Sequence, residues 1–187
     1  DADDGNYDNS GDLQGWWRMG DGDLDDGNIA GNGLIGDQTN ATLGSELLAT
    51  TGWTLESVWT LSGGVLTFDD AGNGRAKLLA ANMTNGTGMS VGKVYKLQYT
   101  ISNLSSGTAD IRIDDEDGNL QIAEVSEANG SYTKYFSATN DGKGLAFVAL
   151  AAGDGSFDIS SYSLKQVNGN PGIMTNMTAS DIVEDTP

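Results

Sequence analysis

The sequence predicts an all-β fold, a jelly-roll β-sandwich of about eight to nine antiparallel strands with extended N- and C-terminal arms. Two observations support this prediction. The 187 residues include 27 glycines and only two prolines, a composition typical of short strands joined by tight turns. No stretch keeps apolar residues at helical spacing over three turns. We therefore expect very little helix.

The clearest strand signal lies at residues 93–102, where polar and apolar residues alternate in KVYKLQYTIS. Tyr95, Leu97, Tyr99 and Ile101 fall on one face of such a strand, and the polar residues fall on the other. Alternation of this kind is typical of an antiparallel strand with one buried face. This segment anchors the fold prediction.

The rest of the middle segment follows the same logic. Residues 109–114 alternate again, and the Asp117-Gly118 step predicts a hairpin into residues 120–125. Residues 145–151, LAFVALA, are apolar on both faces, which indicates a central, covered strand. Further strands are expected, in chain order, at residues 52–61, 65–68, 75–80, 131–138 and 157–167.

Composition divides the chain into three segments. Residues 1–44 form an acidic N-terminal arm with ten acidic residues and one base. Residues 45–167 carry the regular strands, and residues 168–187 form a polar tail. Two adjacent exposed indoles are costly, so the arm's tryptophans must pack against something. We expect assembly contacts at Trp16, Trp17, Met174 and Met177.

The residue counts exclude several functions. With 27 acidic and nine basic residues the net charge is −18, which disfavours nucleic-acid binding. The chain has no cysteine and no histidine, so thiolate chemistry and a histidine base are missing. No apolar run approaches the roughly 20 residues that span a bilayer, so no membrane span is expected.

Motifs in the middle segment resemble a known group of domains. They are Glu46-Leu47, Gly52-Trp53, residues 59–64 (WTLSGG), residues 91–97 (VGKVYKL), residues 155–159 (GSFDI) and residues 162–165 (YSLK). Their order resembles jelly-roll domains similar to extracellular carbohydrate-binding modules, common in phage tail and other virion proteins. The resemblance covers about residues 45–167.

The flanks resemble a second group. Residues 16–21 (WWRMGD) and 168–177 (NGNPGIMTNM) are similar to laminin-G-like, concanavalin-type segments of marine phage structural proteins. Together the resemblances imply a non-enzymatic virion protein, a capsid decoration or tail-associated subunit of a marine bacteriophage. Its partners would be further copies or neighbouring virion proteins, at the virion surface or outside the cell.

The alternative function is a carbohydrate-binding module of a secreted or cell-surface protein, with a polysaccharide as its partner. A virion module that adheres to glycans would combine both functions. A hydrolase is disfavoured because the sequence has no nucleophile elbow, no phosphate loop and no histidine for a triad.

Aromatic side chains are the candidate glycan-binding residues. Trp53 and Trp59 could stack against sugar rings, and core packing is the alternative because large aromatic side chains are mostly buried. Tyr135 is a third candidate, since it alternates with Tyr132 and Phe136 along its strand.

Two calcium sites come into question. Residues 21–27, DGDLDDG, carry alternate aspartates, but their glycine falls at the seventh position, where an EF-hand loop needs it at the sixth. A solvated acidic loop is the alternative for this run. The resemblance to jelly-roll modules implies one structural Ca²⁺ near Glu46 and Asp158, with ordinary surface carboxylates as the alternative.

Overall fold

The structure is a computed structural model that describes residues 34–35, 42–69, 71–150, 155–168 and 172–173. The chain divides into two compact units. The larger is Ser45–Gln166, and the second consists of Asp1–Gly44 and Val167–Pro187. In the second unit, β1 (Leu34–Ile35) and β13 (Gly172–Ile173) pair antiparallel. Within the described ranges, no helix is long and apolar enough to cross a membrane.

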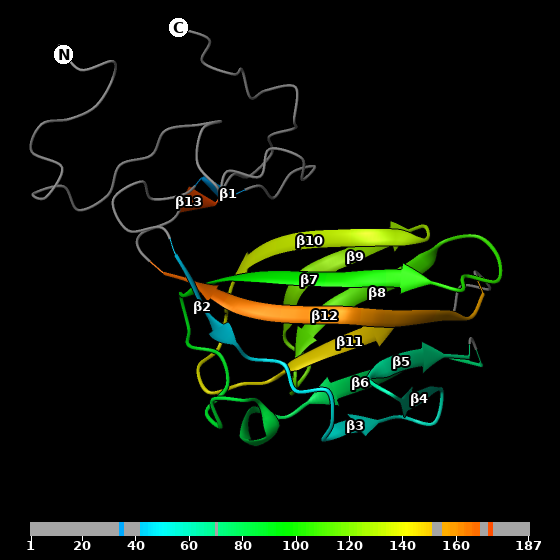
Figure 1. The fold of residues 1–187 in the computed structure, drawn as a ribbon, viewed down its shortest axis with the longest axis horizontal. Coiled ribbons are helices and arrows are strands. Elements are labelled where there is room, and N and C mark those ends of the chain that lie inside the picture. Colours follow the sequence, from blue (N-terminus) through cyan, green and yellow to red (C-terminus); the bar gives the residue numbers. More distant parts are fainter. Residues whose placement is uncertain (1–33, 36–41, 70, 151–154, 169–171, 174–187) are drawn as a thin grey trace, which may run out of the picture. The chain divides into compact units, whose positions relative to one another are not determined.

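The larger unit is built from two antiparallel sheets that lie face to face (Figure 1). One sheet has the spatial order β10 (Gly130–Ser137), β7 (Val94–Ser102), β12 (Phe157–Val167), β5 (Val65–Phe68) and β4 (Trp59–Ser62), with β2 (Leu43–Glu46) also paired to β12. The other has the order β3 (Trp53–Leu55), β6 (Gly74–Leu78), β11 (Leu145–Ala149), β8 (Ala109–Asp115) and β9 (Leu120–Glu127). A single 3₁₀ turn, Ala80–Asn82, is the only helical element in the described residues. The predicted all-β sandwich is confirmed.

One strand prediction was wrong in detail. Residues 52–61 were expected to form one strand, but they form β3 and β4, which belong to different sheets. The chain turns between them, where the Trp59 amide donates to the Glu56 carbonyl at 2.9 Å. Because β3 pairs with β6 and β4 pairs with β5, this turn carries the chain from one layer to the other.

The core lies between the two inner faces and follows the predicted alternation. Tyr95, Leu97, Tyr99 and Ile101 of β7 are all buried in it. All five residues of β11 are buried, as expected for a central strand with both faces covered. The hairpin from β8 into β9 is also present as predicted.

A buried polar contact joins the sheets at one edge. The Tyr99 hydroxyl of β7 donates to Glu127 Oε2 of β9 at 2.7 Å, and Lys134 Nζ of β10 lies 2.8 Å from Glu127 Oε1. Burial and the neighbouring Glu127 carboxylate raise the pKa of Tyr99 above its ordinary value. Both oxygens of a buried carboxylate therefore have partners, as such a group requires.

The acidic turn between β8 and β9 is structural. Asp115 Oδ1 accepts from the amides of Asp117 and Asn119, each at 2.9 Å. Asp115 Oδ2 accepts from the side-chain amides of Asn119 at 2.9 Å and Asn140 at 3.0 Å. Burial acts to raise the pKa of Asp115, but these hydrogen bonds outweigh it and hold the pKa below its usual value. The carboxylate form thus stabilises the fold.

The neighbouring carboxylate ties two loops to this turn. Glu116 Oε2 accepts from the amides of Ala80 at 2.6 Å and Gly144 at 3.0 Å. A Cβ atom at position 144 would lie 1.9 Å from the Leu78 carbonyl oxygen. Only glycine allows this close approach of the two backbones.

Replacing Asp115→Asn should lower the free energy of unfolding by about 1–3 kcal/mol at pH 7, because one of the two buried carboxylate oxygens, which accepts from two donors, becomes an amide donor. A depressed pKa gives stability that is present above about pH 4 and lost as the pH falls through the folded-state pKa. The difference between wild type and variant should therefore shrink on acidification below about pH 4, as measured by urea unfolding.

Asp117→Asn is the matched control, since Asp117 is exposed and pairs with Lys143 at the surface. Its effect should stay within about 0.5 kcal/mol. Equal effects of the two substitutions would contradict the role given to Asp115.

Candidate functional site

The outer face of the five-stranded sheet carries two arginines on strands that flank β11. On β6, Ala76 points into the core and Arg75 points outward, and on β8 Ile111 and Ile113 point inward while Arg112 points outward. Arg75 and Arg112 both pair in register with Val148 of β11, one from each side. Strand alternation therefore places both guanidinium groups over the same part of the sheet.

One buried carboxylate holds both arginines. Asp114 Oδ2 accepts from Arg75 Nη2 at 2.7 Å and from Arg112 Nη2 at 2.8 Å, and Oδ1 accepts from Arg112 Nε at 2.9 Å. The Asp114 side chain is 0% exposed, whereas the Arg75 and Arg112 side chains are 24% and 36% exposed. The two charge-assisted bonds from Arg112 are bidentate and fix the orientation of its guanidinium group, and Arg75 adds a single bond of the same kind.

A depression with a volume of about 320 Å³ lies beside these arginines. Its lining includes Glu56, Arg75, Arg112, Val148 and Leu150. Glu56 Oε2 accepts from the Arg75 backbone amide at 3.0 Å, which fixes the carboxylate at the rim. The depression thus combines fixed donors, a fixed acceptor and an apolar floor.

The four charged groups of this site balance. Arg75 and Arg112 contribute two positive charges, and Asp114 and Glu56 contribute two negative ones. A guanidinium group has five N–H donors, and Asp114 takes two from Arg112 and one from Arg75. The two guanidinium groups therefore keep N–H donors that Asp114 does not use, and the four charged groups together carry no net charge.

The structure places both candidate tryptophans in the core. Trp53 stacks on Phe147 with ring centroids 5.9 Å apart, and its Nε1 donates to the Ala49 carbonyl at 2.8 Å. Trp59 packs against Phe68 at 5.3 Å and Phe157 at 5.9 Å. Because these rings are buried against other aromatic rings, the structure favours the core-packing alternative over sugar stacking.

Tyr135 does alternate with Tyr132 and Phe136, as its sequence predicts. It pairs in register with Lys96, whose ammonium group lies 5.7 Å from the ring centroid. The residue is only 2% exposed, so its ring does not offer a stacking platform. The accessible aromatic side chains expected from the sequence are thus not found among the three candidates.

The two candidate calcium ligands have different partners: Glu46 contacts β12, whereas Asp158 belongs to β12 and contacts Thr67 and Asn103. Glu46 Oε1 accepts from the Leu164 amide at 2.8 Å and Glu46 Oε2 accepts from the Ser163 hydroxyl at 2.5 Å. Asp158 accepts instead from the Thr67 hydroxyl at 2.5 Å and from Asn103 Nδ2 at 2.6 Å. Among the described residues no group of three acidic, histidine or cysteine side chains is arranged to hold a metal. A structural Ca²⁺ at Glu46 and Asp158 stays a prediction.

Several predicted residues lie outside the described residues. They are the assembly candidates Trp16, Trp17, Met174 and Met177, and the acidic run at residues 21–27. The arginine pair, by contrast, is described but was not singled out from the sequence. The sequence pattern that could have indicated this site is the alternation of Arg112 and Asp114 with the apolar Ile111 and Ile113, which places both polar side chains on one face of the strand.

The sequence matches no protein-family model and no curated protein. Similar solved structures include the CBM22-1 xylan-binding domain of Paenibacillus barcinonensis Xyn10C, at 11% identity and a TM-score of 0.46 over 70% of this chain and 98% of that one. The mannan-binding module of Man5C has 15% identity and a TM-score of 0.44 over 66% and 100% of the two chains. The second N-terminal cellulose-binding domain of Cellulomonas fimi β-1,4-glucanase C has 16% identity and a TM-score of 0.43 over 67% and 96%. With TM-scores below 0.5, these likenesses lend no weight to the site described above.

The core position of Trp59 can be tested by stability. Trp59→Ala should lower the free energy of unfolding by about 3–5 kcal/mol, because it leaves a cavity beside Phe68 and Phe157. Val91→Ala is the control, since Val91 is 56% exposed and should change stability by no more than about 0.5 kcal/mol. A loss below about 1 kcal/mol for Trp59→Ala in denaturant unfolding would place the indole at the surface.

Proposed function

We propose that the larger unit is a non-catalytic glycan-binding module whose binding site is the depression between Arg75 and Arg112. The observation that carries this proposal is the pair of guanidinium groups held by buried Asp114 on the outer face of the sheet. Donors that are fixed before binding lose little conformational entropy when a ligand arrives. A site of this kind supports specific binding of a ligand without catalysing a reaction.

The chemistry of the depression suits a sugar. Each sugar hydroxyl can both donate and accept, the arginine groups only donate, and the Glu56 carboxylate only accepts. Leu150, which is partly exposed, offers apolar contact to the C–H groups of a sugar ring, whereas Val148 is only 4% exposed and adds little contact area. Because the charges of the site balance while the chain carries −18, an uncharged glycan fits better than an anionic one.

A shallow site of this size is expected to bind weakly. Dissociation constants between about 1 μM and 1 mM correspond to binding free energies of about −8 to −4 kcal/mol. Such affinities suffice for adhesion to a polymer with many repeats, where avidity adds to each contact. The proposed partner is therefore a polysaccharide outside the cell.

Arg112→Ala should weaken binding to a retained polysaccharide at least tenfold, and Arg112→Lys should do nearly the same, because an ammonium group cannot reproduce the bidentate fork. Affinity electrophoresis against soluble xylan, mannan and β-glucans measures this loss. Urea unfolding of each variant shows that the fold is intact.

Lys77→Ala is the matched control. Lys77 lies on β6, on the same face as Arg75, but does not line the depression. Its removal should leave retention unchanged. No retention of the wild-type protein on any neutral polysaccharide, or equal retention of the wild-type and Arg112 proteins, would contradict the proposed site.

A structural role in a virus particle is a second proposal. It rests on the sequence of the flanks, in which Trp16, Trp17, Met174 and Met177 are apolar side chains in polar segments. Capsid decoration or tail attachment would use these residues for contacts with further copies or neighbouring virion proteins, at the virion surface. Cryo-microscopy of source particles should then show the chain at regular positions, and its presence only as free monomer would argue against this role.

A further inference from the structure

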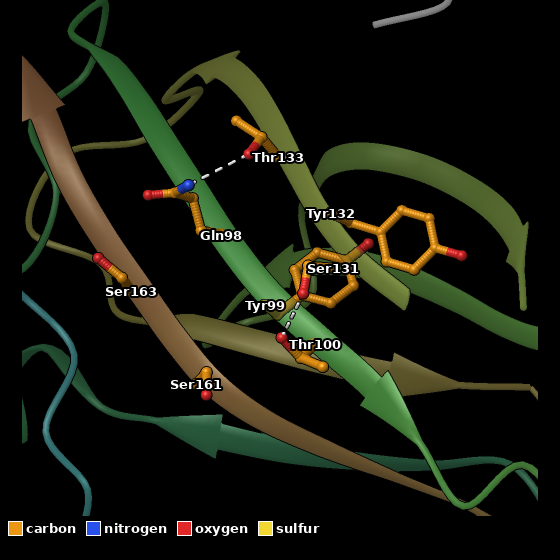
Figure 2. Close-up of a pocket in the computed structure, with 8 residues that line it drawn as sticks. All are labelled: Gln98, Tyr99, Thr100, Ser131, Tyr132, Thr133, Ser161 and Ser163. Carbon is orange, nitrogen blue, oxygen red and sulfur yellow. Dashed lines mark hydrogen bonds between the residues drawn. The ribbon is translucent and has the colours of Figure 1, made fainter. Parts of the chain in front are cut away.

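The outer face of the six-stranded sheet bears a second depression, of about 240 Å³, across β10, β7 and β12 (Figure 2). Six of its lining side chains are uncharged and carry a hydroxyl or amide group: Gln98, Thr100, Ser131, Thr133, Ser161 and Ser163. We use the name hydroxyl face for these six residues. It lies on the opposite side of the sandwich from the arginine depression.

Hydrogen bonds between strands hold part of the hydroxyl face in place. Gln98 Nε2 donates to Thr133 Oγ1 at 3.2 Å, and the hydroxyl oxygens of Thr100 and Ser131 are 2.9 Å apart (Figure 2). These pairs lie directly opposite each other on β7 and β10. After these bonds Gln98 still offers its carbonyl oxygen and Thr133 its hydroxyl proton. The face therefore presents oriented donors and acceptors together.

A β-bulge in β12 brings a further hydroxyl to this face. Ser160 pairs with Thr100 and Ser163 pairs with Gln98, so two residues of β12 stand opposite Tyr99. Ser161 adopts a φ of 49°, a region that L-residues other than glycine rarely occupy. Its neighbour Tyr162 packs inward against Trp53 with ring centroids 5.3 Å apart. The bulge thus turns Ser161 outward while keeping the core filled, as bulges next to binding sites do.

We infer that the hydroxyl face is a second glycan-binding surface, which takes an uncharged glycan chain independently of the arginine depression. Each of the six side chains has a group of the kind that both donates and accepts, which matches the hydroxyl groups of a sugar. The Ser163 hydroxyl already donates to Glu46, so toward a ligand it acts as an acceptor. None of the six carries a charge, although the chain as a whole carries −18. The core of a protein–protein interface is enriched in apolar and aromatic side chains. Here the lining adds only two aromatic residues to the six polar ones, Tyr99, which is 1% exposed, and Tyr132, which is partly buried.

Two binding surfaces on opposite sides of one sandwich allow the protein to contact two glycan chains at once. A single molecule could bridge two polysaccharide chains, and linked binding events can raise avidity by about 10²–10⁴-fold. The inference extends the proposed function to a second surface, and the two surfaces can fail separately. The protein would then cross-link a soluble polysaccharide without forming oligomers of its own.

The test removes the hydroxyl face with the double variant Gln98→Ala/Thr133→Val, alone and combined with Arg112→Ala. The polysaccharide is the one that the full chain retains best in affinity electrophoresis. Arg112→Ala alone should keep measurable retention, and adding the double variant should reduce that remainder at least tenfold. Light scattering of the wild-type protein mixed with the polysaccharide should show cross-linked particles, which either face variant prevents.

Thr60→Ala is the control, because Thr60 is exposed on β4 of the same sheet and does not line the depression. The inference would be overturned if Gln98→Ala/Thr133→Val left retention unchanged both in the wild-type protein and in Arg112→Ala. The arginine site would not be affected by that result. Complete loss of retention in Arg112→Ala alone would also overturn the inference. Loss with the double variant but not with Arg112→Ala would support the hydroxyl face and reject the arginine site.

Discussion

The packing of Phe147 between the two sheets fixes the geometry on which both outer faces depend. Phe147 sits on central strand β11, and its ring meets Trp53 from its own sheet at 5.9 Å. From the facing sheet it meets Tyr99 at 5.6 Å and Tyr162 at 6.3 Å. Aromatic contacts of this kind add to the burial of a large apolar area. Because Phe147 must point inward, its neighbours Ala146 and Val148 must point outward.

That constraint explains why the arginine depression forms where it does. Ala146 is small and lies beside Asp114 in register, so Arg75 can reach the Asp114 carboxylate from β6, on the far side of β11. A larger side chain at position 146 would stand in the path of this contact. Val148 separates Arg75 from Arg112 and forms the apolar floor. The core contact of Phe147 and the surface site at Arg75 and Arg112 therefore lie on opposite faces of the same strand, β11.

Local patterns predicted the strands well but not their combination. The alternation in residues 93–102 and the apolar run at 145–151 depend only on neighbours in sequence. The structure confirms a strand at Val94–Ser102 and a strand at Leu145–Ala149. The arginine site depends on the register of β6 and β8 across β11, between residues separated by 37 positions in the case of Arg75 and Arg112. No local signal encodes such a register. The bulge at Ser161 was not predicted for the same reason. It depends on the register of β12 against β7 and on the packing of Tyr162 against Trp53, which residues nearby in sequence do not show.

The most direct test of the account is an NMR titration of the ¹⁵N-labelled protein with a soluble oligosaccharide of a retained polysaccharide. The account predicts that the side-chain Nε–Hε signals of Arg75 and Arg112 and the backbone amide of Val148 shift in a saturable manner. Shifts confined to loops at the ends of the sandwich, with these three signals unchanged, would contradict it.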